Sequence, residues 1–277
     1  MRIPRSWAKA SGQAETSEGK PRMLSVWGWG DNESTAWSEA SRRLERALER
    51  LRGGAGEADA YAYDDRPPRE ELVQVLAKSG AEPTAALTRC RYGALVLNAS
   101  RLLFLDIDLA PEGGLGKLKR LFGGADPLDA ALERLRAPLR ESGATFRLYR
   151  TAAGLRALAV DREFDPTAPG TKELMQRTGT DPAFVTLCRV QQTFRARLTP
   201  KPWRCACPNP PGEHPRSAPE LARRFAAWRE RYEQASERFA TCRYLESVGS
   251  AAPAPALRDL VELHDRSTRS AEALPLA

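Results

Sequence analysis

The order of the secondary-structure elements predicted for residues 101–198 restricts the fold of this chain more than any other feature. Short apolar stretches and helical patterns follow one another there as strand, helix, strand, strand, helix and strand. This βαββαβ order is the plan of ferredoxin-like, or RRM-like, sheets. We therefore predict an α+β fold in which the first of these strands lies between the third and the fourth. Helices are expected to cover one face of the sheet and to leave the other face open and polar.

The core is assigned to residues 91–202. Its strands are predicted at 101–109, 146–151, 155–161 and 188–198, with an additional strand at 92–98, helices near 127–142 and 170–178, and a glycine- and lysine-rich loop at 111–126. The part that follows, residues 203–277, is predicted to be a proline-rich loop and two C-terminal helices at 219–241 and 257–266.

The segment before the core is predicted from its composition and periodicity. Residues 1–21 are polar and aperiodic and are expected to be a disordered tail. Residues 22–90 are expected to form an α/β extension, in which a strand at 23–30 leads into a long helix. A second, short helix is predicted at 69–78.

The composition argues against several classes of protein. Hydrophobic residues make up 42% of the 277 residues and charged residues 29%, which is ordinary for a folded domain. No apolar run reaches the roughly 18 residues that a membrane-spanning helix needs, and no secretory signal follows the basic N-terminus. Five scattered cysteines, an odd number, suit a reducing compartment. We therefore expect a cytoplasmic protein of bacterial type with no membrane partner.

The chain is basic, with 43 Lys and Arg against 36 Asp and Glu, and arginine far outnumbers lysine. The net charge of +7 permits a polyanionic partner such as nucleic acid. A GC-rich genome would supply the same excess of arginine, so the charge by itself does not identify a partner.

Two carboxylates share one face of the first core strand. Side chains alternate along a strand, so Asp106 and Asp108 point to the face opposite Leu105 and Ile107. Positions i and i+2 lie roughly 7 Å apart along a strand, and carboxylates at that spacing can hold one or two hard cations. We therefore expect Mg²⁺ or Mn²⁺ at Asp106 and Asp108, where the metal would bind the phosphate oxygens of a nucleotide.

Basic residues flank this acidic pair in the expected topology. Arg156 lies on the third strand and Arg195 and Arg197 on the fourth, where guanidinium groups could bind phosphate in a bidentate manner. Lys201 and Arg204 would extend the basic surface. The alternative is structural, because acids and arginines on one sheet face can form cross-strand salt bridges that bind no ligand.

Three segments resemble the motif regions of the archaeo-eukaryotic primase superfamily, the primase-polymerases. They are FLDID at 104–108, YRTAAGLRAL at 149–158 and FRARLTPKP at 194–202. The resemblance covers about 100 residues and implies a divergent metal-dependent nucleotidyltransferase that acts on nucleotides or nucleic acid. It implies that Asp106 and Asp108 are the catalytic metal ligands.

The resemblance also implies roles for residues of the second motif. Thr151 and Gly154 would form the turn beside the bound substrate, and Arg156 takes the place of a nucleotide-binding histidine. Arginine cannot shuttle a proton, because its pKa lies above roughly 12. The candidates for a third catalytic acid are Asp161, at the end of the third strand, and Asp165 just beyond it. The departure at Arg156 leaves a second function open, that of a catalytically inactive primase-like module with a binding or structural role.

Two other kinds of site are disfavoured. Cys205 and Cys207 with His214 could bind zinc, but structural zinc sites separate their cysteines by two to four residues, so we expect no zinc. The run FLDIDL also resembles the first strand of haloacid-dehalogenase-type phosphatases. Leu109, Ala110 and Pro111, at the end of this run and just after it, do not fit the pattern of that family. The predicted strand–strand hairpin at 146–161 does not fit the family's alternating α/β sheet.

Overall fold

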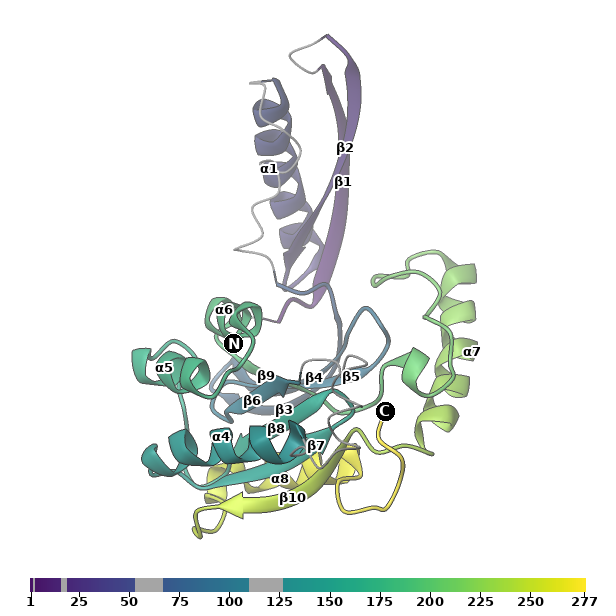
Figure 1. Cartoon of the computed structure of the whole chain (residues 1–277). Coiled ribbons are helices and arrows are strands. Elements are labelled where there is room, and N and C mark those ends of the chain that lie inside the picture. Colours follow the sequence, from purple (N-terminus) through teal and green to yellow (C-terminus); the bar gives the residue numbers. More distant parts are fainter. Residues whose placement is uncertain (2, 16–18, 53–66, 110–126) are drawn as a thin grey trace. The chain divides into compact units, whose positions relative to one another are not determined.

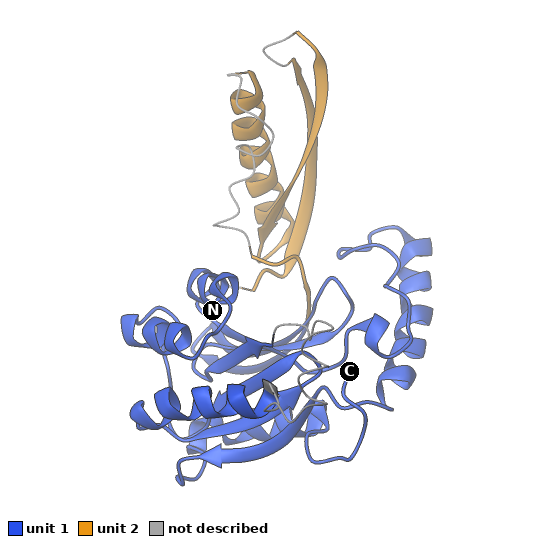
Figure 2. Ribbon diagram, in the orientation of Figure 1, with its two compact units in different colours: residues 1, 73–277 blue, residues 2–72 orange. Residues whose placement is uncertain are grey.

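The computed structural model describes residues 1, 3–15, 19–52, 67–109 and 127–277 (Figure 1). It divides into two compact units, one of residues 2–72 and one of residues 73–277 with Met1 (Figure 2). The chain combines antiparallel strands with helices, so the predicted α+β class is confirmed. The loop predicted at 111–126 lies outside the described residues.

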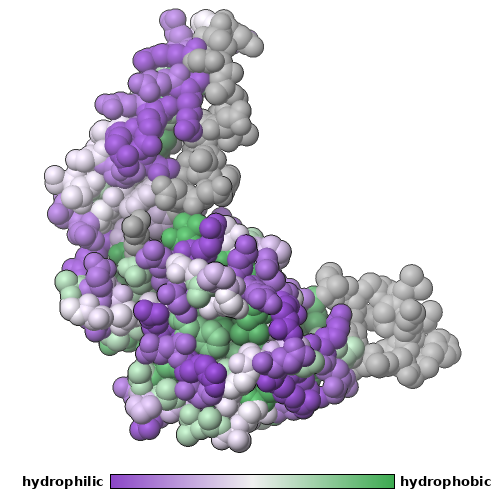
Figure 3. Space-filling model, turned by 90° about the vertical axis from the view of Figure 1, so that its left-hand side faces the viewer, coloured by the Kyte–Doolittle hydropathy of each residue, from purple (hydrophilic) through white to green (hydrophobic). Residues whose placement is uncertain are grey.

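The smaller unit is a two-stranded hairpin with one long helix. β1 (Ser6–Glu15) pairs antiparallel with β2 (Pro21–Gly30), and α1 (Glu33–Arg52) runs along the hairpin (Figure 1). The outward surface of α1 is largely hydrophilic (Figure 3), as expected for a helix that buries a single face. The disordered tail predicted for residues 1–21 is therefore wrong, because ten of its residues form β1.

Small residues explain both the hairpin and the error in predicting it. Ala8, Ala10 and Ala14 alternate with exposed positions and are buried, but alanine adds little to a hydrophobic pattern. A Cβ at Gly28 would lie 2.1 Å from the backbone nitrogen of Ala40 in α1. The helix can therefore approach the hairpin this closely only because position 28 has no side chain.

Two four-stranded sheets form the larger unit. The first has the order β3-β4-β5-β9 and consists of β3 (Glu71–Ser79), β4 (Glu82–Arg89), β5 (Leu95–Ala99) and β9 (Phe194–Arg197). The second has the order β10-β7-β8-β6 and consists of β6 (Phe104–Asp108), β7 (Phe146–Thr151), β8 (Gly154–Ala159) and β10 (Cys242–Val248).

The short helix predicted for 69–78 is wrong, because most of that segment is β3. Val73 and Val75 favour a strand, and Gly80 provides the positive φ of 58° at the turn into β4. Pairing with β4 therefore outweighs the helical propensity of the Glu and Lys residues in this segment.

The predicted βαββαβ order is present along the chain, but its strands do not form one sheet. The helices in this order are α4 (Pro127–Glu141) after β6, and α5 (Pro169–Arg177) and α6 (Pro182–Gln191) after β8. β6 pairs with β8, whereas β9 pairs with β5 in the other sheet. The expectation that the first strand is hydrogen-bonded between the third and the fourth is therefore wrong.

The reason lies in the segment predicted as the strand 188–198. The Asp181 side chain accepts a hydrogen bond from Ala183 N, Pro182 opens the first turn of α6, and Gln192 ends the helix in a left-handed conformation with φ 52°. Only four residues remain for β9, and they pair with β5.

The C-terminal part supplies the outer strand of the second sheet. The helix predicted at 219–241 ends earlier, as α7 (Pro219–Ser236), and β10 follows and pairs with β7. α8 (Pro255–Thr268), which corresponds to the helix predicted at 257–266, places the buried His264 ring against Phe104 of β6 and Tyr149 of β7. The sheet face that carries the two acids is therefore partly covered by a helix, and the expectation of a fully open face is wrong.

Among the described helices, none combines the length and the apolar character that crossing a lipid bilayer requires.

Candidate functional site

The two carboxylates predicted to act together lie near the end of β6. Phe104 and Leu105 are buried at the start of the strand. The Asp106 side chain is 37% exposed, and Asp108 is exposed. β6 is the outer strand of its sheet, with β8 as its neighbour. Both acids are thus accessible, as the sequence predicted.

Arg156 holds Asp106 in a bidentate ion pair. The two residues lie directly opposite each other on β8 and β6. Arg156 Nε donates to Asp106 Oδ1 at 2.6 Å, and Nη2 donates to Oδ2 at 2.9 Å. The Arg156 side chain is only 4% exposed. This is the cross-strand salt bridge of the structural alternative, and a guanidinium so close to both oxygens opposes the approach of a divalent cation.

The inner edge of the guanidinium is also occupied. Arg156 Nη1 donates to the carbonyl oxygen of Arg197 at 3.0 Å and lies 3.4 Å from His264 Nε2 and 3.6 Å from Cys242 Sγ. Because an arginine donates only, His264 Nε2 acts as the acceptor in this contact. Arg156 therefore links β6, β8, β9, β10 and α8.

A second carboxylate fixes His264 from its other side. Asp265 accepts from Tyr149 Oη at 2.6 Å and from Arg147 Nη1 at 2.5 Å, and lies 3.0 Å from His264 Nδ1. Burial lowers the pKa of His264, although the hydrogen bond to Asp265 acts in the opposite direction. His264 is thus held neutral, with its proton on Nδ1 and its Nε2 lone pair toward Arg156.

The pKa of Arg156 reflects the balance of this network. Burial, the largest single effect, would lower it, but the charge and hydrogen bonds of Asp106, with smaller contributions from Cys242 and Tyr149, together outweigh burial and raise the pKa of Arg156 above its ordinary value. The guanidinium is therefore a permanent cation whose principal counter-charge is Asp106.

The predicted basic residues gather beside the acids. Burial and the charge of Arg156 lower the pKa of Arg197. Burial, followed by the charges of Arg197 and Arg204, lowers the pKa of Lys201, and the charge of Asp108 also acts on Lys201. Arg195 donates to Gln191 Oε1 at 3.3 Å; burial raises the pKa of the Cys188 thiol, the charge of Arg195 lowers it and the charge of Asp106 raises it. We call the set Asp106, Asp108, Arg156, Arg195, Arg197, Lys201 and Arg204 the Asp106 site.

The predicted turn at Thr151 and Gly154 lies at the same end of the sheet. Thr151 Oγ1 accepts from the backbone nitrogens of Ala153 at 3.3 Å and Gly154 at 3.0 Å, which closes the turn between β7 and β8. Gly154 is opposite Asp108, and a Cβ there would lie 2.0 Å from the carbonyl oxygen of Ile107. The glycine is thus required for β8 to pair closely with the strand that carries the acids.

Asp161 does not belong to the Asp106 site. It lies beyond the far end of β8, five residues after Arg156, which corresponds to roughly 16 Å along an extended chain. Its Oδ1 accepts from Thr145 N at 2.9 Å, and its Oδ2 is 3.2 Å from Arg162. The other candidate, Asp165, accepts from Thr167 and pairs with Arg101. The structure thus does not bring Asp161, predicted as a third catalytic acid, together with Asp106 and Asp108: its carboxylate joins the ends of β7 and β8.

The segment that carries Lys201 and Arg204 is anchored to α7. Tyr232 Oη donates to the Pro200 carbonyl at 2.6 Å, and Trp228 Nε1 donates to the Pro208 carbonyl at 2.8 Å. Trp228 and Tyr232 stack with their ring centroids 4.9 Å apart. Cys205 and Cys207 are buried against these aromatic rings. Within the described ranges, no group of three or more His, Cys, Asp or Glu is arranged to hold a metal ion.

An aromatic pair projects next to this basic segment. Trp203, in the short helix η2 (Pro202–Arg204), is 49% exposed. Its ring meets Tyr92 edge to face at 5.0 Å, and Lys201 Nζ lies 5.3 Å from its centroid. We call Tyr92, Lys201 and Trp203 the Trp203 platform.

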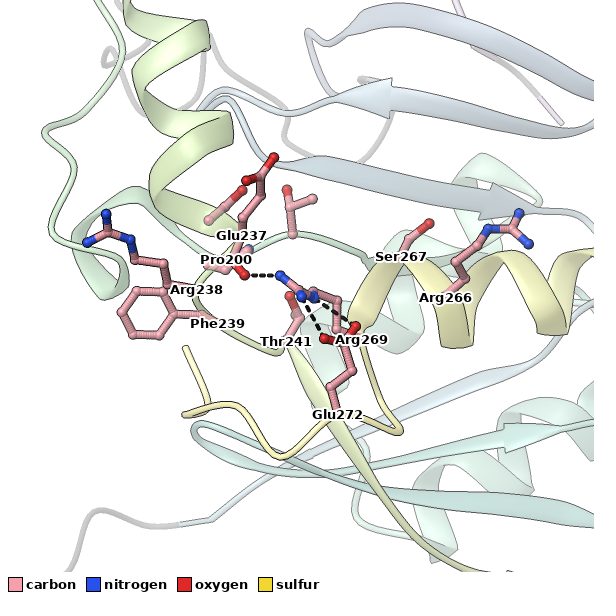
Figure 4. Close-up of a pocket in the computed structure, with 11 residues that line it drawn as sticks. Pro200, Glu237, Arg238, Phe239, Thr241, Arg266, Ser267, Arg269 and Glu272 are labelled. Carbon is pink, nitrogen blue, oxygen red and sulfur yellow. Dashed lines mark hydrogen bonds and ion pairs between the residues drawn. The ribbon is translucent and has the colours of Figure 1, made fainter.

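A cavity of about 630 Å³ lies elsewhere, where the end of α7 approaches the end of α8. Arg269 extends across it, donating to Glu272 and to the carbonyl of Glu237 (Figure 4). These contacts tie the chain after α8 to the end of α7, so Arg269 and Glu272 have a structural role here.

Sequence reasoning missed the support behind Arg156 and the exposed platform. His264 lies 108 residues after Arg156 in the sequence, so no local pattern relates the two. Its position on the buried stripe of α8, together with Leu257, Val261 and Thr268, is a signal that could have placed it in the core. An exposed Trp between two basic residues is the corresponding signal at Trp203.

The chain matches no protein-family model, and no curated protein and no solved structure is significantly similar to it. The antiparallel pairing of β6 with β8 differs from the parallel sheet that the phosphatase alternative requires.

Proposed function

We propose that this protein is a primase-like module that binds the phosphates of nucleotides or nucleic acid at the Asp106 site without a divalent metal. The observation that carries the proposal is the bidentate pair between Arg156 and Asp106. Asp106 serves as the anchor of a buried arginine there, a role that competes directly with metal binding.

The surplus of positive charge supports an anionic ligand. Among the described residues of the Asp106 site there are five basic side chains and two carboxylates, and Asp106 is already paired with Arg156. The pKa values of Arg197 and Lys201 are lowered, by burial first and then by neighbouring cations. A phosphate placed among these groups would relieve their mutual repulsion, and a guanidinium can hold two phosphate oxygens at once.

A second function, a divergent metal-dependent nucleotidyltransferase, is favoured by one observation. Asp106 and Asp108 share a face and remain accessible at the end of β6, which is the arrangement of a carboxylate pair that binds Mg²⁺ or Mn²⁺. For this function Arg156 would have to release at least one oxygen of Asp106 when the metal binds.

Fluorescence anisotropy of the full chain with a labelled single-stranded oligothymidine separates the two functions. The proposal predicts the same affinity in EDTA and in Mn²⁺, and a steep loss of affinity as NaCl is raised. Asp108→Asn removes an exposed negative charge, so it is expected to leave binding unchanged or to strengthen it. Binding that needs Mn²⁺ and disappears in Asp108→Asn would instead support the nucleotidyltransferase.

A structural role without ligands is the remaining outcome. In that case neither the wild-type chain nor the variant would bind the oligonucleotide at low salt, with or without metal. Lys172→Ala, an exposed site on α5, provides a charge-matched control for variants of the basic segment.

A further inference from the structure

We infer that the Trp203 platform is a stacking site for an unpaired nucleobase, so that the ligand of this surface is single-stranded nucleic acid. The inference rests on the proposed function and adds the chemical class of the ligand and the subsite that reads it.

The first step of the argument is the exposure of the Trp203 ring. An indole that leaves 49% of its residue surface in water keeps a large apolar area unburied, and a stacked base would cover it. Tyr92 meets the indole at an interplanar angle of 87°, which supports the ring edge to face. The two rings are therefore not stacked in parallel.

The second step is the position of the positive charge. Lys201 lies on the same short segment with its Nζ over one face of the indole, 5.3 Å from the centroid, so a base would stack on the other face; the charges of Arg197 and Arg204 act on Lys201. An aromatic face beside a line of cations is the combination that binds single strands, because the cations contact the phosphates and the ring contacts the base. A base inside a duplex is already stacked on both sides and cannot reach the ring.

The third step is the rigidity of the segment. Tyr232 and Trp228 bind the backbone on both sides of the platform, at Pro200 and Pro208, and the backbone nitrogens of Cys205 and Cys207 donate to the Pro202 carbonyl. The platform is thus pre-organised, so a ligand would lose little free energy in ordering it.

The test compares three labelled ligands in EDTA: a 12-nucleotide oligothymidine, an abasic strand with the same number of phosphates, and a 12-base-pair duplex, which carries about twice as many phosphates. The expected order of affinity is oligothymidine above both the abasic strand and the duplex. Trp203→Leu should weaken oligothymidine binding by roughly 5- to 150-fold and leave the abasic strand unaffected, as expected for the loss of one base–aromatic stack. Trp203→Phe should recover part of the loss.

The matched control is Trp37→Leu, since Trp37 is 54% exposed on α1 and should have no effect. Equal binding of the abasic and base-bearing strands, or a Trp203→Leu chain that binds like wild type, would overturn the stacking site and leave phosphate binding intact. If neither strand binds at low salt, the proposed function fails and the stacking site fails with it.

Discussion

Asp106 and Arg156 face each other across β6 and β8 with both oxygens of the carboxylate bound to the guanidinium, at 2.6 and 2.9 Å. The arginine is buried and the acid is partly exposed. The pair therefore connects the interior network around His264 with the surface at which a ligand would bind. Its energetic and functional roles can be measured separately.

Removal of either partner should destabilise the fold. Arg156→Met and Asp106→Asn are each expected to lower the free energy of unfolding by about 2 to 3 kcal/mol, somewhat less than a fully buried pair because Asp106 is 37% exposed. Urea denaturation followed by circular dichroism measures the change.

The double variant provides the control for this prediction. If the two groups act as a pair, Arg156→Met combined with Asp106→Asn costs less than the sum of the single variants. Strictly additive losses would show that the arginine is stabilised mainly by its contacts with Arg197 and His264.

Substitution of Gly154 should disturb the acidic strand. Its Cβ would stand 2.0 Å from the Ile107 carbonyl, so Gly154→Ala forces β6 and β8 apart at Asp108 and should cost about 1 to 3 kcal/mol. Gly170→Ala is the matched control, because nothing lies within 4 Å of a Cβ at that position in α5 and little or no loss is expected. Thermal unfolding of both variants decides the point, and an equal effect would remove the reason for a glycine at position 154.

Acidification should destabilise the protein through His264. Burial lowers the pKa of this histidine in the folded state, whereas in the unfolded chain it titrates near pH 6.5. As the pH falls below about 6.5, the unfolded state takes up a proton that the folded state does not, so the free energy of unfolding decreases by up to about 1.4 kcal/mol per pH unit.

His264→Asn tests this assignment, because an amide can still donate to Asp265 but does not titrate. The loss of stability between pH 7 and pH 5 should become shallower in the variant. A slope identical to that of the wild-type chain would show that another group controls the pH response.

The basic segment should determine the salt dependence of binding. Each phosphate contact to a single strand contributes a slope of about 0.7 to the plot of log affinity against log salt concentration. Lys201→Ala is expected to reduce the slope by about that amount, whereas Lys172→Ala should not change it. Titrations at several NaCl concentrations provide the slopes, and a slope that Lys201→Ala leaves unchanged would place the phosphates elsewhere.

The local part of the site was predictable from sequence, and the long-range part was not. Alternation along β6 correctly placed Asp106 and Asp108 together, and the short segment around Gly154 correctly predicted a turn. Local patterns determine which side chains share a strand face. They also allowed the cross-strand pair of Asp106 with Arg156 as the structural alternative.

The errors concern which distant segments pair. β9 joins β5 because the preceding residues form α6, and β10 reaches β7 from about 90 residues further along the chain. The sheet face that carries the acids is partly covered by α8. The apolar stripe of α8 shows that the helix is buried on one side, but not which sheet it packs against. Asp161 is a related case. Its position at the end of a predicted strand does not show that this end of the sheet is the one away from Asp106.

The pairing of β10 with β7 has a consequence for how the protein is made on the ribosome. When residue 202 leaves the exit tunnel, the outer edge of β7 is still exposed and His264 has not yet been synthesised to back Arg156. The nascent chain therefore carries an unpaired strand edge and a poorly supported buried cation until its last quarter emerges, an interval in which a holding chaperone would be most useful.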